Sequence, residues 1–171
     1  MTMPGDGSSA VEPPSATIDS SNPVVALCVA GMELDGLPGE AHRLFVQAWE
    51  ARRDDYDAAV AAHFLARHQS TPADALHWNA LAVRHAEALT DGRADEFFSS
   101  LCLNLADSFA SVGEFRAAVA SADRAAAHLP DVRDGGYRRF VERGIHTLQA
   151  SLRHAQPHAG PERGGEADDR R

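Results

Sequence analysis

The residue types best suited to chemistry are concentrated in one short segment, Ala62 to Gln69, with the sequence AHFLARHQ. His63, Arg67 and His68 fall within two helical turns of this segment. Arginine binds a carboxylate through two parallel hydrogen bonds, and histidine can hold a proton or a metal ion. The helical zinc motif H-E-x-x-H places its histidines four residues apart, whereas these two are five apart and lack the glutamate. The segment therefore favours a polar binding site over a zinc centre.

No catalytic motif accompanies this segment. His77 and His85 share a helical face, but no cysteine or carboxylate completes a metal site with them. The sequence contains no G-x-S-x-G motif, no phosphate-binding loop and no dinucleotide-binding run of glycines. We therefore expect no catalytic residues, no metal and no cofactor, and hence a protein that is not an enzyme.

The charge and the apolar segments restrict the partners and the location. The 16 basic and 25 acidic residues give a formal charge of -9, whereas nucleic-acid binding depends on clustered cations. The apolar run at residues 23–34 is too short to span a bilayer, and no basic residue precedes Arg43 as a secretory signal requires. Cys28 and Cys102 are far apart and lack metal-ligand spacing, which favours buried thiols in a reducing compartment. We expect a cytoplasmic protein that binds neither nucleic acid nor membranes.

Helical periodicity dominates residues 22–154 and predicts seven helices in one domain. Asn22 is the expected N-cap of the first helix, and Pro38 and Pro72 open the second and the fourth. Gly113 marks the turn between the fifth and sixth helices, and Asp91-Gly92 is the expected stop of the fourth. Residues 1–21 and 155–171 are rich in proline, glycine, serine or charge and lack a period, so they are predicted to be disordered tails.

A spaced alanine pattern, Ala-x3-large-x2-Ala, occurs in this helical region at Ala41-Phe45-Ala48. Related copies follow at Ala75-Asn79-Ala82 and Ala118-Ala122-Ala125. Around the third copy, further residues occupy the positions at which the tetratricopeptide repeat has its characteristic residues. These are Leu105, Ala106, Phe109, Gly113, Phe115 and Pro130. The chain therefore resembles the tetratricopeptide repeat (TPR) family, and its run Leu103-Asn104-Leu105-Ala106 is similar to the kinesin-light-chain type.

The resemblance implies an all-α fold. It consists of three antiparallel helix pairs at residues 22–53, 55–90 and 95–130, wound into a right-handed superhelix, and of a capping helix at 137–154. In this family the first helix of each pair lines a concave groove that binds extended peptides. The groove residues implied for this chain are Asp57, Phe64, Arg67, His68, Asn104 and Asp107, with Asn104 holding peptide backbone. His63, Trp78 and Asn79 depart from the family pattern and are additional candidates for ligand contact, although His63 and Trp78 also suit packing between helices.

These observations favour a non-catalytic module that binds a peptide segment of a partner protein in the groove. Two alternatives remain open. One is a small-molecule sensor or divergent metal-dependent enzyme centred on His63, Arg67, His68 and Trp78. The other is a homo-oligomeric scaffold.

Overall fold

The fold consists of seven α-helices and one 3-10 turn, with no strand among residues 21–34 and 36–155, which the computed structural model describes. The predicted tails lie almost wholly outside these residues. The helices are α1 (Pro23–Met32), α2 (Pro38–Glu50), α3 (Asp55–Ala66), α4 (Pro72–Glu87), α5 (Asp95–Ser111), α6 (Phe115–His128) and α7 (Gly136–Ala155), with η1 (Leu129–Asp131) before α7. The predicted all-α class is confirmed. Among the described helices, none combines the length and the hydrophobicity that a membrane span requires.

Local sequence signals set most helix boundaries. The side-chain oxygen of Asn22 accepts hydrogen bonds from the amides of Val24 and Val25 at 2.8 and 3.3 Å, so the predicted N-cap is confirmed. The prediction that α4 extends to Asp91-Gly92 is wrong. The helix ends at Glu87 because the next two amides bond to carbonyls only three residues back, which tightens the last turn and stops the helix.

The turn between α5 and α6 depends on Gly113. Its φ of 83° lies in the left-handed region, which glycine adopts without steric cost. This conformation lets the amide of Glu114 reach back to the carbonyl of Phe109 at 2.9 Å and satisfy one of the last carbonyls of α5. The predicted turn is confirmed.

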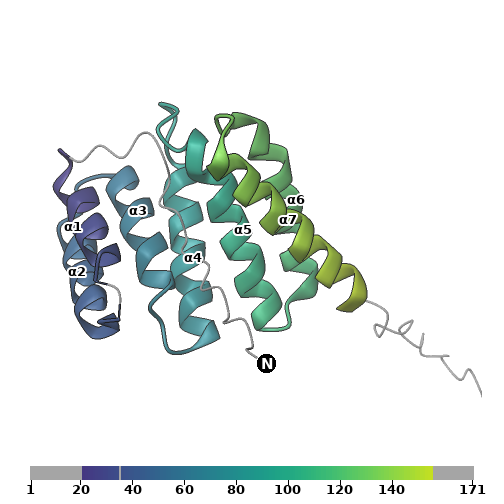
Figure 1. The fold of residues 1–171 in the computed structure, drawn as a ribbon, viewed down its shortest axis with the longest axis horizontal. Coiled ribbons are helices and arrows are strands. Elements are labelled where there is room, and N and C mark those ends of the chain that lie inside the picture. The colour runs from purple at the N-terminus through teal and green to yellow at the C-terminus, as the bar shows by residue number, and fades with distance from the viewer. Residues whose placement is uncertain (1–20, 35, 156–171) are drawn as a thin grey trace, which may run out of the picture.

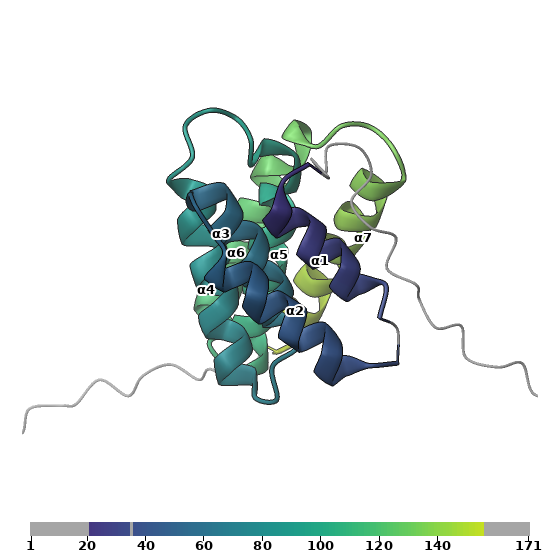
Figure 2. The same ribbon diagram turned by 90° about the vertical axis from the view of Figure 1, so that its left-hand side faces the viewer.

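The helices pack as successive neighbours along the chain. The most extensive contacts join α1 to α2, α3 to α4 and α5 to α6, and α7 packs against α5 and α6 (Figure 1). Helices α1 and α3 also touch directly, as do α5 and α7, whereas α3 and α5 meet through a few side chains. In the end-on view α1 and α7 both lie to the right of α3, so the row of odd-numbered helices is curved (Figure 2). This row presents the surface on which the candidate site lies.

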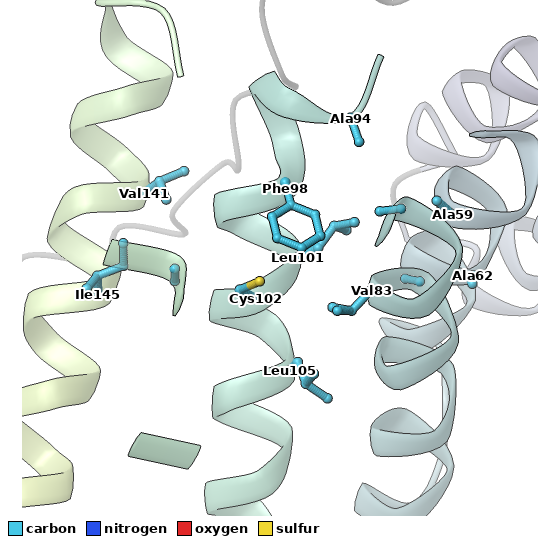
Figure 3. Close-up of a cluster of buried hydrophobic side chains, with 13 residues drawn as sticks. Ala59, Ala62, Val83, Ala94, Phe98, Leu101, Cys102, Leu105, Val141 and Ile145 are labelled. Atoms are coloured by element: carbon cyan, nitrogen blue, oxygen red, sulfur yellow. The ribbon is translucent and has the colours of Figure 1, made fainter. Parts of the chain in front are cut away.

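Helix α5 is central to the apolar core. Its residues Phe98, Leu101, Cys102 and Leu105 are buried between α3 and α4 on one side and α6 and α7 on the other (Figure 3). The positions of the repeated alanine pattern are buried, except for Ala75. Small side chains at these positions allow neighbouring helix axes to approach closely.

One large apolar residue of the last helix is exposed. Phe140 directly precedes the buried Val141, but 45% of its surface is accessible. The buried side of α7 instead follows Val141, Ile145 and Leu152, at the i, i+4, i+11 spacing of one helical face.

Candidate functional site

Two parallel helices, α3 and α5, form a mixed aromatic and polar surface, which we call the α3–α5 face. Its residues are Tyr56, His63 and Arg67 of α3 and Phe97, Ser100, Asn104 and Asp107 of α5. The rings of Tyr56 and Phe97 meet edge to face, with centroids 5.9 Å apart. About two helical turns further along, the amide nitrogen of Asn104 lies 3.4 Å from Nδ1 of His63. These two contacts fix the register of α3 against α5.

Arg67 and Asp107 lie about one turn beyond the contact between His63 and Asn104, and both are exposed. Within the described part of the chain, neither side chain makes a hydrogen bond or an ion pair. Arg67 is the C-cap of α3, where its charge favours the negative end of the helix dipole. An arginine and an aspartate without partners can bind a carboxylate and a cation, respectively.

His63 is partly covered between the two helices. Burial, and to a smaller extent the charge of Arg67, lowers its pKa from 6.5 to about 4. The ring is therefore neutral near pH 7. With its proton on Nε2, the neutral ring accepts the amide hydrogen of Asn104 at Nδ1. His63 thus has a packing role on this face, and Nε2 remains as a donor.

His68 and Phe64 both lie against Phe45 of α2. The rings of Phe64 and Phe45 are stacked with centroids 5.5 Å apart, and Phe64 is only 8% exposed. Phe64 is therefore a core residue, which corrects its predicted place in the groove. The ring of His68 is 4.8 Å from that of Phe45. Partial burial, followed by the charges of Arg67 and His42, lowers the pKa of His68.

Asp57 corrects a second predicted groove position, because it has no accessible surface. Its carboxylate accepts hydrogen bonds from the side chain of Asn22 at 2.6 Å and from the backbone and Nε of Arg53 at 3.1 and 3.0 Å. These bonds link the start of α1 to the turn between α2 and α3. Asp57 is a structural residue.

Trp78 and Asn79 also lie between helices, not on the α3–α5 face. The Trp78 ring meets the Trp49 ring of α2 edge to face at 4.9 Å, so it fills a gap between helix pairs. Asn79 is 7% exposed and donates to Ser108 Oγ at 2.8 Å and more weakly to the carbonyl of Asn104 at 3.5 Å. Both side chains thus make contacts within the protein, and for Trp78 this is the packing role that the sequence also suggested.

An open pocket of about 320 Å³ adjoins the C-terminal end of the α3–α5 face. We call it the Asp107 pocket. It is lined by Gln69, Ser70, Thr71, Pro72, Ala75, Asp107, Ser108 and Ser111. Asp107 therefore belongs both to the α3–α5 face and to this pocket.

A second open pocket, of about 420 Å³, lies near the turn between α2 and α3. Two of its carboxylates pair with protein groups: Asp55 lies 2.7 Å from Nδ1 of His85, and Asp54 lies 2.9 Å from Arg93, which is outside the pocket. These pairs join α3 to α4 and to the segment before α5. None of the predicted site residues lines this pocket. Arg53, which does line it, donates a hydrogen bond to the predicted residue Asp57.

The sequence prediction missed the aromatic end of the α3–α5 face. Tyr56 lies seven residues before His63, a spacing of two helical turns that places both on one face. On the far side of α5, the hydroxyl of Tyr137 lies 2.7 Å from Ser100 Oγ and brings α7 to the edge of this face. Among the described residues, no group of three or more histidine, cysteine, aspartate or glutamate side chains could hold a metal ion.

No protein-family model, curated protein or solved structure matches the chain. The fold and the site define an all-helical domain of paired helices with a mixed polar and aromatic face between its third and fifth helices.

Proposed function

We propose that this domain is a TPR-like, non-catalytic module that binds a peptide segment of a partner protein along the α3–α5 face. Three observations support the repeat assignment: the helices pack as successive pairs, the odd-numbered helices form a curved row, and the repeated alanine pattern is buried apart from Ala75. A right-handed superhelix with α7 as its cap is the arrangement that this assignment implies.

One observation carries the proposed function. Arg67 and Asp107 project from adjacent parallel helices without partners in the described part of the chain, beside the amide of Asn104. A peptide backbone offers a donor and an acceptor at each residue, which a primary amide can match. The exposed charges on either side suit side chains of opposite charge, and the Tyr56–Phe97 pair supplies apolar area.

The sensor or enzyme alternative has less support. It needs His63, Arg67, His68 and Trp78 around one enclosed site, but the three ring side chains among them contact different neighbours. Trp78 contacts Trp49, His68 contacts Phe45, and His63 contacts Asn104. An extended surface fits this arrangement better than a small enclosed pocket.

The experiment uses the full chain with a photo-crosslinking amino acid in place of Ser100, exposed to a lysate of the native cells. We expect crosslinks to a peptide segment of one or a few partner proteins, identified by mass spectrometry. Arg67→Ala combined with Asn104→Ala should abolish them while the helical circular dichroism is retained. Crosslinks that persist in this double variant would contradict the proposal.

Two controls complete this test. The same crosslinker in place of Ala126, an exposed residue of α6, should give none of these products, and Arg139→Ala on α7 should leave the Ser100 crosslinks unchanged. Light scattering on the purified chain distinguishes the homo-oligomeric scaffold, for which Ser100 would crosslink to a second copy of the chain.

A further inference from the structure

We propose that the Asp107 pocket binds the cationic side chain, an arginine or a lysine, of the partner peptide. This inference rests on the proposed function and specifies the chemistry that the peptide must carry. It follows from the hydrogen-bonding state of the groups that line the pocket.

The one charged side chain among the lining residues is the carboxylate of Asp107. It is exposed and has no hydrogen-bond or ion-pair partner in the described part of the chain. Gln69 donates its amide nitrogen to the carbonyl of Leu65 at 2.9 Å, which leaves its side-chain oxygen free to accept. The pocket therefore offers a charged and a neutral acceptor to a donor-rich ligand.

The hydroxyl groups of the pocket add further acceptor capacity. Ser108 Oγ already accepts a hydrogen bond from Asn79 and keeps a second lone pair, and Ser111 is exposed. Both serines lie in the last turns of α5, where the helix dipole places partial negative charge. A guanidinium or ammonium group, with several donors and no acceptor, complements such a lining.

The start of α4 also borders the pocket, and a helix N-terminus usually favours an anion. At the start of α4, most of the amide groups that could bind an anion are already used or absent. Pro72 has no N–H group, the amide of Asp74 donates to Thr71 Oγ1 at 3.1 Å, and the amide of Ala75 donates to the carbonyl of Thr71. Asp74 itself, bonded to the Thr71 hydroxyl at 2.6 Å, places a negative charge in the first turn. These contacts oppose anion binding and leave the cation as the better ligand.

The pocket also has a suitable size and position. A volume of about 320 Å³ admits one long side chain. Because Asp107 lies one turn beyond Asn104 on α5, a peptide backbone held at Asn104 can direct a basic side chain into the pocket. The positive charge of Arg67 lies outside the lining and remains available to an acidic residue of the same peptide.

The test titrates the full chain with the blocked tripeptides acetyl-Gly-Arg-Gly-amide and acetyl-Gly-Lys-Gly-amide and follows backbone amide signals by NMR. We expect saturable shifts at Ser70, Asp107, Ser108 and Ser111, with dissociation constants in the millimolar range for such small ligands. The uncharged analogue with citrulline in place of arginine should bind at least about tenfold more weakly, because it lacks the charge-assisted bond.

Two variants locate the interaction. Asp107→Asn should lower the affinity for the arginine peptide by about tenfold or more. Glu142→Gln, which neutralises an exposed carboxylate on α7, should leave that affinity unchanged. Equal binding of the citrulline peptide, unchanged binding by Asp107→Asn, or no shift in the pocket would each overturn the inference.

The outcomes also separate this inference from the function on which it rests. If the arginine peptide does not bind but the Ser100 crosslinks form, the pocket is not a basic-residue site and the peptide-binding function stands. If the arginine peptide binds the pocket but the Ser100 crosslinks do not form, the pocket stands and the function assigned to the α3–α5 face is wrong.

Discussion

Asn22 donates its side-chain amide to the buried carboxylate of Asp57 across 2.6 Å and thereby joins the cap of α1 to the first turn of α3. This bond spans 35 residues of sequence. The same carboxylate anchors Arg53, so one side chain holds three segments together. A residue that the repeat register places in the groove is thus a structural link of the N-terminal helices.

We expect Asp57→Ala to lower the free energy of unfolding by about 2–4 kcal/mol, because it leaves the donors of Asn22 and Arg53 without their acceptor. Urea denaturation followed by circular dichroism measures this change. The matched control, Asp107→Ala, removes an exposed carboxylate without partners and should change stability by less than about 0.5 kcal/mol. Equal effects of the two substitutions would refute the structural role of Asp57.

Acid should destabilise the fold through His63. Because burial lowers its folded-state pKa from 6.5 to about 4, the unfolded chain takes up more protons between these values. The stability contributed by the neutral ring is complete above pH 6.5 and is lost as the pH falls toward 4. We expect this group to account for a loss of about 1–3 kcal/mol.

Urea denaturation at a series of pH values tests this expectation. His63→Gln should flatten the decline in stability between pH 6.5 and 4, whereas His146→Gln, at an exposed position of α7, should leave it unchanged. His68, whose pKa is also lowered, should contribute in the same direction. An unaltered slope in His63→Gln would show that the ring is not held neutral.

Close contact between α1 and α2 should make Gly31 intolerant of a side chain. A methyl group at this position would overlap the ring of Phe45, which is fully buried and cannot move aside easily. We expect Gly31→Ala to cost about 1–3 kcal/mol despite the higher helix propensity of alanine. Gly39 in α2 has open space around it, so Gly39→Ala should be neutral or stabilising by up to about 1 kcal/mol. Thermal unfolding of both variants would decide the point, and a stable Gly31→Ala protein would argue against this contact.

The two thiols should be unreactive in the folded protein. Burial raises the pKa of Cys28 to about 12 and that of Cys102 to about 11, so neither forms thiolate near pH 8. A thiol-reactive chromophore should therefore label neither cysteine at pH 8 and label both in urea. Ser151→Cys, at an exposed position of α7, should add one site that reacts rapidly without denaturant. Fast labelling of the native unaltered chain would contradict the burial of these thiols.

Local signals in the sequence predict most of the helices correctly. Asn22 before Pro23, and Thr71 before Pro72, combine an N-cap side chain with a proline at the first helical position. Gly113 supplies the left-handed turn. Each signal acts within a few residues, so the sequence alone is sufficient to read it.

The candidate site was harder to predict because it depends on how neighbouring helices are rotated. The repeat register directs Phe64 toward the groove, whereas the structure directs the adjacent His63 toward α5. One residue corresponds to a rotation of about 100° around the helix axis. The prediction for Asp57 was wrong for a related reason. Its partner Asn22 caps another helix, and no local sequence pattern predicts that contact. Arg67 and Asp107 are exposed and Asn104 is partly buried, so the prediction that these residues line a peptide groove stays a prediction.

The packing of each helix against helices close to it in sequence also affects the rate and the order in which the domain folds. Most packing joins helices that are consecutive or next but one in the sequence, so few contacts require long loops to close. Domains dominated by such short-range contacts fold quickly, and they lose structure from their ends inward. α5, buried between α3 and α4 on one side and α6 and α7 on the other, should therefore retain its amide protons longest in hydrogen exchange, whereas α1 should exchange early.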